Sequence, residues 1–134
     1  MKVVHTLLLG SLLAVSGCES DTNEPIVTSI VETFASRLQE KGMAWRSVHV
    51  TTAGEVRLQL VALTQLDAVM NLGIGDISGT QCVIAASVDT IVKSDVVAPQ
   101  LVRTLPVGTY CVRLLDIGNL TQLVDFTIRI EKPF

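Results

Sequence analysis

The sequence predicts an all-β fold, a single antiparallel β-sandwich of about seven to nine strands with jelly-roll or Greek-key-like connections. Two observations indicate this fold. Apolar and polar residues alternate with a period of two in several segments, most clearly in residues 55–63 (EVRLQLVAL) and 124–130 (VDFTIRI). Glycine, proline and asparagine lie between such segments, as they do at the turns of a sheet.

The stretch from Leu105 to Ile130 contains the two strands around which we expect the domain to be organised. A Pro-x-Gly turn signal precedes a strand at 109–115, and an Asp-x-Gly-Asn signal precedes a strand at 124–130. Phe126 and Ile130 share one face of the second strand. We predict that these two strands form a hairpin and that the remaining strands cover it.

The other elements are taken in chain order. Residues 26–38 are ambiguous, because Ile30, Phe34 and Leu38 have helical spacing while the alternation around Phe34 also fits a strand. The pattern then predicts strands at 43–50, 55–63, 69–75, 80–88 and 100–105, turns at 40–42, 51–54 and 76–79, and a more polar connection at 89–98.

The first residues have the features of an export signal. Lys2 supplies a positive charge, and residues 7–15 form an apolar region shorter than the about 20 residues that a membrane helix needs. The sequence Val15-Ser16-Gly17-Cys18 then resembles the lipobox of bacterial lipoproteins. The resemblance implies that residues 1–17 are a removable signal peptide and that Cys18 is lipidated.

This resemblance also implies how the mature protein is organised. Residues 18–29 would form the lipidated cysteine and a polar, flexible tether, and residues 30–134 would form the β-sandwich. Attachment to the membrane would be through the N-terminal lipid. Because Glu19 stands where aspartate would favour the inner membrane, the resemblance favours the outer membrane of the cell envelope.

The cysteines predict one disulfide. When Cys18 is assigned to the lipid, Cys82 and Cys111 remain as an even pair. Exported proteins reside in oxidising compartments, so we predict a Cys82–Cys111 disulfide. The alternative is a pair of buried free thiols that pack as small apolar residues.

Three segments, TTAGEVRLQL, NLGIGDISGTQC and LPVGTYCVRLLDIGNLTQLVDFTIRI, together resemble the bacterial pre-peptidase C-terminal type of β-sandwich. The matching positions are Ala53, Gly54, Val56, Leu58, Leu105, Gly108, Tyr110, Val112, Phe126 and Ile128. The resemblance covers about residues 30–131 and implies that Val31–Leu38 is a strand. It also implies an accessory, binding or folding role in a secreted or surface protein.

Composition and motifs argue against several kinds of chemistry. A formal charge of −3 without a Lys/Arg cluster, and an aromatic content of 4%, argue against nucleic-acid binding. His49 is the only histidine after the signal peptide, and the sequence contains neither a Gly-x-Ser-x-Gly nor a His-Glu-x-x-His motif. Gly73 and Gly75 lack the third glycine of a dinucleotide loop, and predict a bulge or a close backbone approach.

Four aspartates in predicted turns, Asp76, Asp89, Asp95 and Asp116, are expected to accept hydrogen bonds from nearby backbone amides. Their spacing does not match a calcium-binding loop. We therefore predict no catalytic residue, no metal site and no cofactor.

The expected function is that of a lipid-anchored, non-catalytic binding or accessory module for a protein or glycan of the cell envelope. Two alternatives stay open. One is a small envelope hydrolase, or an accessory or inhibitor of an enzyme. The other is a structural spacer without a specific ligand.

Overall fold

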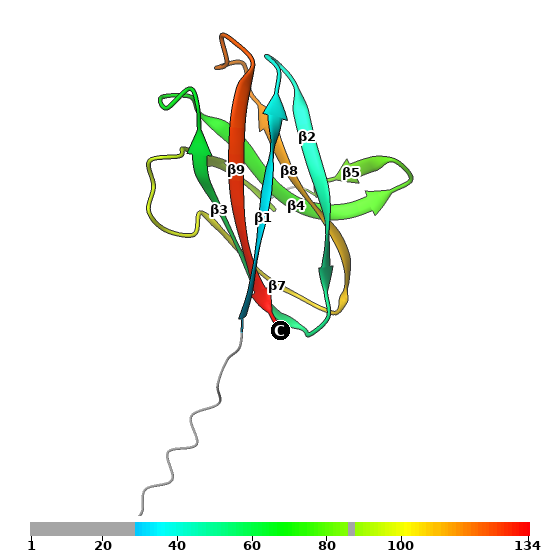
Figure 1. The fold of residues 1–134 in the computed structure, drawn as a ribbon. Coiled ribbons are helices and arrows are strands. Elements are labelled where there is room, and N and C mark those ends of the chain that lie inside the picture. The colour runs from blue at the N-terminus through cyan, green and yellow to red at the C-terminus, as the bar shows by residue number, and fades with distance from the viewer. Residues whose placement is uncertain (1–28, 86–87) are drawn as a thin grey trace, which may run out of the picture.

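The computed structural model describes residues 29–85 and 88–134, which form two antiparallel sheets packed face to face (Figure 1). In this part of the chain there are nine strands and no helix, so the predicted β-sandwich is confirmed. The strands are β1 (Ser29–Leu38), β2 (Met43–Val50), β3 (Gly54–Leu63), β4 (Met70–Ser78), β5 (Gln81–Val83), β6 (Asp89–Val92), β7 (Leu101–Leu105), β8 (Gly108–Asp116) and β9 (Val124–Pro133). The signal peptide, Cys18 and nearly all of the tether lie outside the described residues.

Sheet A has the strand order β1-β9-β3-β7, and sheet B has the order β2-β8-β4-β5, with β6 also paired to β4. Most consecutive strands therefore lie in opposite sheets. The predicted hairpin is wrong in this respect, because β8 belongs to sheet B and β9 to sheet A. Residues 117–123, which connect them, form a longer link than most hairpin turns and carry the chain across the end of the core.

The core is aliphatic and lies between the two sheets, as the alternating pattern predicts. Phe126, Ile128 and Ile130 of β9 face Val112 and Leu114 of β8, and all five are buried. The rings of Phe34 and Phe126 meet edge to face, with their centroids 5.2 Å apart. Residues 29–38 therefore form a strand whose inward positions complete this core, and not a helix.

The segment from 70 to 92 differs from its prediction. Asp76, Ile77 and Ser78 still belong to β4, and the turn comes only at Gly79, which has a φ of 60°. In place of one strand over 80–88 there is the short β5, and the expected polar connection begins with β6. Both short strands pair with the same edge of β4, one at each end.

The glycines of β4 make this arrangement possible. A Cβ atom on Gly73 would meet the side chain of Ile84, and one on Gly75 would collide with the carbonyl group of Val83. The chain that follows β5 thus lies directly on the outer face of β4. The close backbone approach predicted for these glycines is confirmed at Gly75, whereas Gly73 is approached by a side chain.

Lys132 connects the two sheets at one end of the sandwich. It occupies an inward position of β9 and is only 5% exposed. Its Nζ atom lies 2.5 Å from Glu32 Oε1 in β1 and donates a hydrogen bond of 2.5 Å to the backbone oxygen of His49 in β2. A buried ammonium group needs such partners, because an unpaired buried charge is strongly destabilising.

The two ends of the sandwich have different components. At the end that we call the base, Ser29 pairs with Pro133, and the turns 51–53 and 106–107 lie side by side because Val50 pairs with Gly108. At the opposite end, which we call the distal end, lie the connections 39–42, 64–69 and 117–123. In Figure 1 the base is the lower end and the distal end is the upper one.

Replacing Phe126 by alanine should lower the free energy of unfolding by about 3–5 kcal/mol, because a buried ring is lost and a cavity remains. Urea unfolding followed by circular dichroism measures this. Phe126→Leu should cost less, and Phe134→Ala, at an exposed position, should cost less than about 0.5 kcal/mol. Equal effects at positions 126 and 134 would contradict the inward assignment of Phe126.

Candidate functional site

The distal connections are held by one carboxylate. Asp116 ends β8, and its Oδ1 atom accepts hydrogen bonds from the backbone N–H groups of Gly118 (2.9 Å), Asn119 (2.8 Å) and Leu120 (3.2 Å). Its Oδ2 atom accepts a bond of 2.7 Å from the N–H of Lys41, which lies in the β1–β2 connection. Asp116 therefore acts as the turn former that the sequence predicts, and it also joins two separate loops.

The pKa of Asp116 reflects this environment. Burial alone would raise it, but the backbone hydrogen bonds from Lys41, Asn119, Gly118 and Leu120 outweigh that effect and hold the pKa below its usual value. The carboxylate is thus charged whenever these loops are in place near neutral pH.

Gln65 holds the third distal connection. Its Nε2 atom donates a bond of 2.9 Å to the backbone oxygen of Asn119, and its Oε1 atom accepts one of 3.0 Å from the N–H of Thr121. Next to it, Thr64 and Asp125 exchange two further hydrogen bonds, from Thr64 N to Asp125 O (3.1 Å) and from Asp125 N to Thr64 Oγ1 (3.0 Å). The three connections therefore form one preorganised surface.

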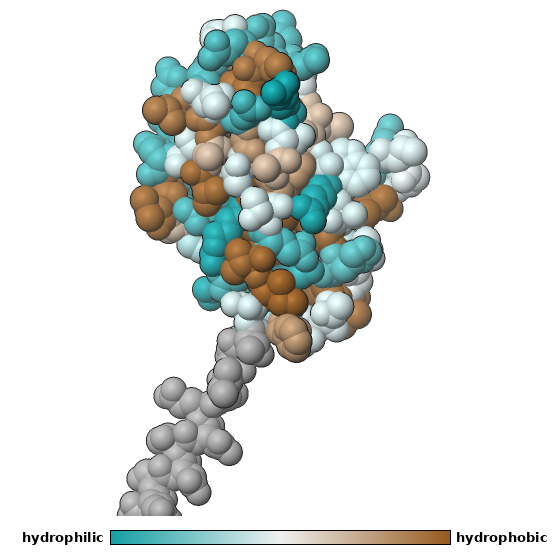
Figure 2. All heavy atoms as spheres, viewed as in Figure 1, coloured by the Kyte–Doolittle hydropathy of each residue, from teal (hydrophilic) through white to brown (hydrophobic). Residues whose placement is uncertain are grey.

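This surface presents apolar side chains to solvent. Leu66 is 73% exposed and Leu123 is 53% exposed, one from each of the two longer connections. Met43 and Ile117 are also exposed at this end. Figure 2 shows apolar side chains at the upper end of the domain, interspersed with polar ones. Clustered exposed apolar groups with a polar surround are typical of surfaces that bind other proteins.

A hollow of about 400 Å³ adjoins Leu66, and we call it the distal hollow. Val61, Phe126 and Thr127 are among the residues that line it. The Oγ atom of Ser94, which also lines it, is shielded from solvent and has no hydrogen-bond partner among residues 29–85 and 88–134. The lining of the distal hollow thus combines apolar side chains with the polar groups of Thr64, Asp125 and Thr127.

The predicted disulfide is present. Cys82 in β5 and Cys111 in β8 are bonded, with their Cα atoms 5.7 Å apart. Cys111 pairs with Gly75 and Cys82 pairs with Ile77, so the bond passes over β4 on the outer face of sheet B. It lies outside the core between the sheets and fixes the short edge strand β5 to the centre of its sheet.

Polar groups lie on the same outer face, toward the other end of β4. Asn71 Nδ2 donates a bond of 2.9 Å to Asp89 Oδ2, and Arg113 donates one of 3.3 Å to Asn71 Oδ1. Trp45 lies opposite Arg113 on the neighbouring strand β2. Of the other aspartates expected in turns, Asp76 lies in β4 and Asp95 lies in the connection before β7.

His49 lies on the same outer face, at the basal end of β2. Its Nδ1 atom is 2.9 Å from Thr109 Oγ1, and no carboxylate is a hydrogen-bond partner of its ring in the described structure. Within residues 29–85 and 88–134, no three His, Cys, Asp or Glu side chains gather as they would around a metal ion. The geometry therefore offers no support for a hydrolase centred on His49.

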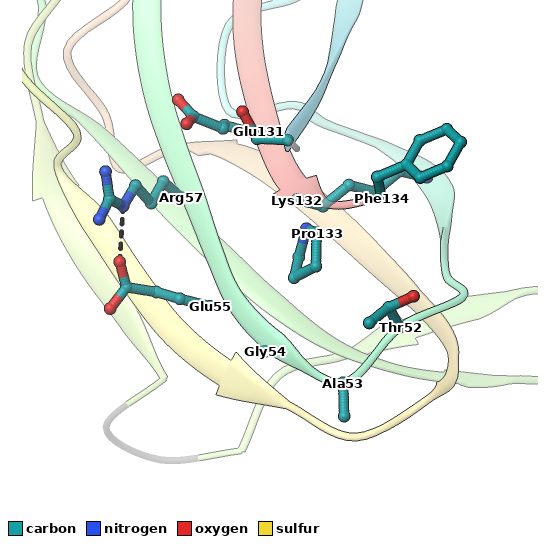
Figure 3. A pocket seen from close by; sticks show the side chains of 10 residues that line it. Thr52, Ala53, Gly54, Glu55, Arg57, Glu131, Lys132, Pro133 and Phe134 are labelled. Carbon is teal, nitrogen blue, oxygen red and sulfur yellow. Dashed lines mark hydrogen bonds and ion pairs between the residues drawn. The ribbon is translucent and has the colours of Figure 1, made fainter. Parts of the chain in front are cut away.

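A larger hollow of about 610 Å³, the basal hollow, opens at the base (Figure 3). Ala53, Pro133 and Phe134 contribute apolar surface to it. Arg57 and Glu55, on the adjoining part of β3, form an ion pair of 2.6 Å. In Figure 3 the ring of Phe134 points away from this pair.

No known protein family matches the sequence, and no curated protein matches it. The described residues also contain no helix that is long and apolar enough to cross a membrane. The sequence predicts the roles of Cys82, Cys111 and Asp116 correctly, but it predicts neither hollow. The exposed Leu66 and Leu123 were a possible signal, since both lie in otherwise polar connections.

Asp116→Asn should weaken the dependence of stability on pH. Because the pKa of Asp116 is lower in the folded than in the unfolded chain, its contribution is present above about pH 4, the unfolded value, and disappears as the pH falls through the folded pKa. The variant should melt at a lower temperature at pH 7 and lose less stability between pH 6 and 3, as thermal unfolding measures.

The stability of Asp116→Asn should still depend on pH to a smaller extent, because Glu131 also contributes. A hydrogen bond from Arg129 lowers the pKa of Glu131 despite its burial. Asp67→Asn, at an exposed position in the same loops, is the matched control and should follow the wild type. A wild-type slope in Asp116→Asn would contradict the assigned role of Asp116.

Replacing Cys82 and Cys111 by serine should lower the free energy of unfolding by about 3–4 kcal/mol in oxidising buffer, because the bond closes a loop with a sequence separation of 29. Urea unfolding of the wild type after reduction should give the same midpoint as the double variant. If the double variant and the oxidised wild type unfold together, the disulfide does not stabilise the domain.

Proposed function

We propose that this chain is a lipid-anchored protein of the cell envelope whose β-sandwich binds a protein partner without catalysing a reaction. The anchor would be Cys18, supported by the lipobox-like Val15–Cys18 directly after an apolar export segment. Glu19 favours the outer membrane. In this proposal the sandwich serves as a binding or accessory module of the pre-peptidase C-terminal-like type.

One observation carries the proposal: exposed apolar side chains lie on loops that are already fixed in position. Leu66 and Leu123 project from connections that Gln65 and Asp116 hold through hydrogen bonds. Preorganised loops lose little conformational entropy on binding, so more of the contact energy appears as affinity. Because β1 begins at the base, the distal end is the one farther from the tether.

A protein partner fits this surface better than a glycan. The exposed groups of the distal end are aliphatic, whereas glycan recognition commonly uses aromatic rings beside hydrogen-bonding groups. A glycan remains a second candidate for the outer face of sheet B, since Trp45 lies there beside Arg113 and near the Asn71–Asp89 hydrogen bond. Loss of glycan binding in Trp45→Ala would favour that face.

Site-specific photocrosslinking in intact cells tests the proposal. With benzoylphenylalanine at position 66 or 123, we expect one discrete crosslinked product, and with the same group at the exposed position 102 of β7 we expect none. Leu66→Asp combined with Leu123→Asp should reduce recovery of the partner about tenfold or more, which corresponds to about 1.4 kcal/mol of binding energy.

Two controls separate the parts of the proposal. Cys18→Ala should abolish acylation and move the protein out of the membrane fraction, and acylation that persists would overturn the anchor assignment. The Leu66→Asp, Leu123→Asp variant should keep its free energy of unfolding within about 0.5 kcal/mol, since both positions are exposed. If no position gives a crosslinked product, the chain is better described as a spacer.

A further inference from the structure

The base has an apolar surface of its own. Phe134 is 70% exposed and Val107 is 63% exposed. Val31, the third residue of β1, is also exposed. The strand pairings Ser29–Pro133 and Val50–Gly108 bring the segments that carry these side chains to one end of the sandwich. Figure 2 shows apolar side chains on the lower part of the domain, near the point where the described chain begins.

The charges of the base cancel one another. Two carboxylates, Glu55 and Glu131, and two cations, Arg57 and Lys132, line the basal hollow. Each takes part in an ion pair: Arg57 with Glu55 (2.6 Å), Glu131 with Arg129 (2.9 Å) and Lys132 with Glu32 (2.5 Å). None of these four side chains is therefore left unpaired to select an anionic or a cationic ligand.

The length of the N-terminal segment determines what the base can contact. Residues 19–28 separate Cys18 from Ser29, which itself lines the basal hollow. Fully extended, that segment spans about 35–40 Å. A domain anchored through Cys18 thus keeps its base within about 40 Å of the lipid headgroups at all times.

We infer that the base is a membrane-contact surface, on which Phe134, Val107 and the walls of the basal hollow rest against the bilayer that holds the anchor. This inference rests on the proposed anchoring at Cys18. Tethering makes the contact intramolecular, so that an apolar surface too small to bind membranes alone is occupied most of the time. Contact at the base orients the long axis of the sandwich away from the membrane and presents the distal loops to the partner.

A bilayer suits this surface better than a second protein. Interfacial binding to a membrane strengthens with the apolar area that is buried, and the base exposes apolar side chains while the charged side chains that line its hollow are paired. The distal end carries similar apolar groups, but it lies at the far end of β1, and it would touch the membrane only if the domain turned over.

Depth-dependent quenching of tryptophan fluorescence tests the inference. The chain from Cys18 is produced without lipid, and Cys18 is coupled to a maleimide phospholipid in phosphatidylcholine vesicles with brominated acyl chains; Cys82 and Cys111 do not react because they are bonded. In a Trp45→Phe background, Phe134→Trp should be quenched about twofold, because interfacial groups reach about 5–10 Å into the headgroup region. Leu66→Trp, at the distal end, should not be quenched.

A second reporter shows whether the apolar groups cause the contact. Thr52→Trp, also at the base, should be quenched in the same background, and adding Phe134→Ser and Val107→Ser should restore its fluorescence. Raising the salt concentration to about 1 M, where charges are screened beyond about 3 Å, should leave the quenching unchanged.

The outcomes separate this inference from the proposed function. Because Cys18 is coupled chemically, the result does not depend on acylation in the cell. Equal quenching of the position-134 and position-66 reporters on the vesicles would overturn the membrane contact while the anchor and the distal partner stood. Quenching that salt abolishes would overturn its apolar basis.

Discussion

Most connections in this sandwich carry the chain from one sheet to the other, and this constraint accounts for several of its polar contacts. Backbone groups in a crossing segment have no neighbouring strand, yet they must be hydrogen-bonded where water is excluded. Asp116 satisfies four N–H groups in two such segments. Gln100 accepts a bond from the N–H of Leu60, just beyond the last pair of β3 and β7. Tyr110 donates to the oxygen of Pro106, and Lys132 to that of His49.

The same constraint gives the two ends of the domain different properties. At the distal end the partners are mostly backbone amides that converge on Asp116 and Gln65, so the loops keep one conformation while their apolar side chains face outward. At the base, the hydrogen bond from Lys132 to the backbone oxygen of His49 joins the two sheets, and ion pairs within sheet A leave no charge unpaired among Glu55, Arg57 and Lys132. One end is thus built from fixed loops and the other from a neutral, partly apolar surface.

The sequence allowed the fold class, most strand positions and the disulfide to be predicted, because alternation and cysteine number are local or countable signals. Alternation identifies which face of a strand is buried but not which strand lies beside it, and for that reason β8 and β9 were wrongly paired. The strand predicted at 80–88 is present only as the short β5, because the chain after it packs onto the glycines of β4, and β6 was missed because it lies in a segment that the sequence indicates as a polar connection. The bond from Lys41 to Asp116 spans a sequence separation of 75, and both hollows combine several distant segments, so no local pattern reveals them.

The pairing of β1 with β9 has a mechanical consequence. Ten residue pairs, from Ser29–Pro133 to Leu38–Val124, join the first strand to the middle of sheet A. In the proposed arrangement, tension between the anchor and a distal partner would pull on the basal end of β1, along the direction of the strands. Such a load shears all ten pairs together and does not peel them apart one by one. The domain is thereby suited to remain folded while it transmits force between the membrane and whatever it holds.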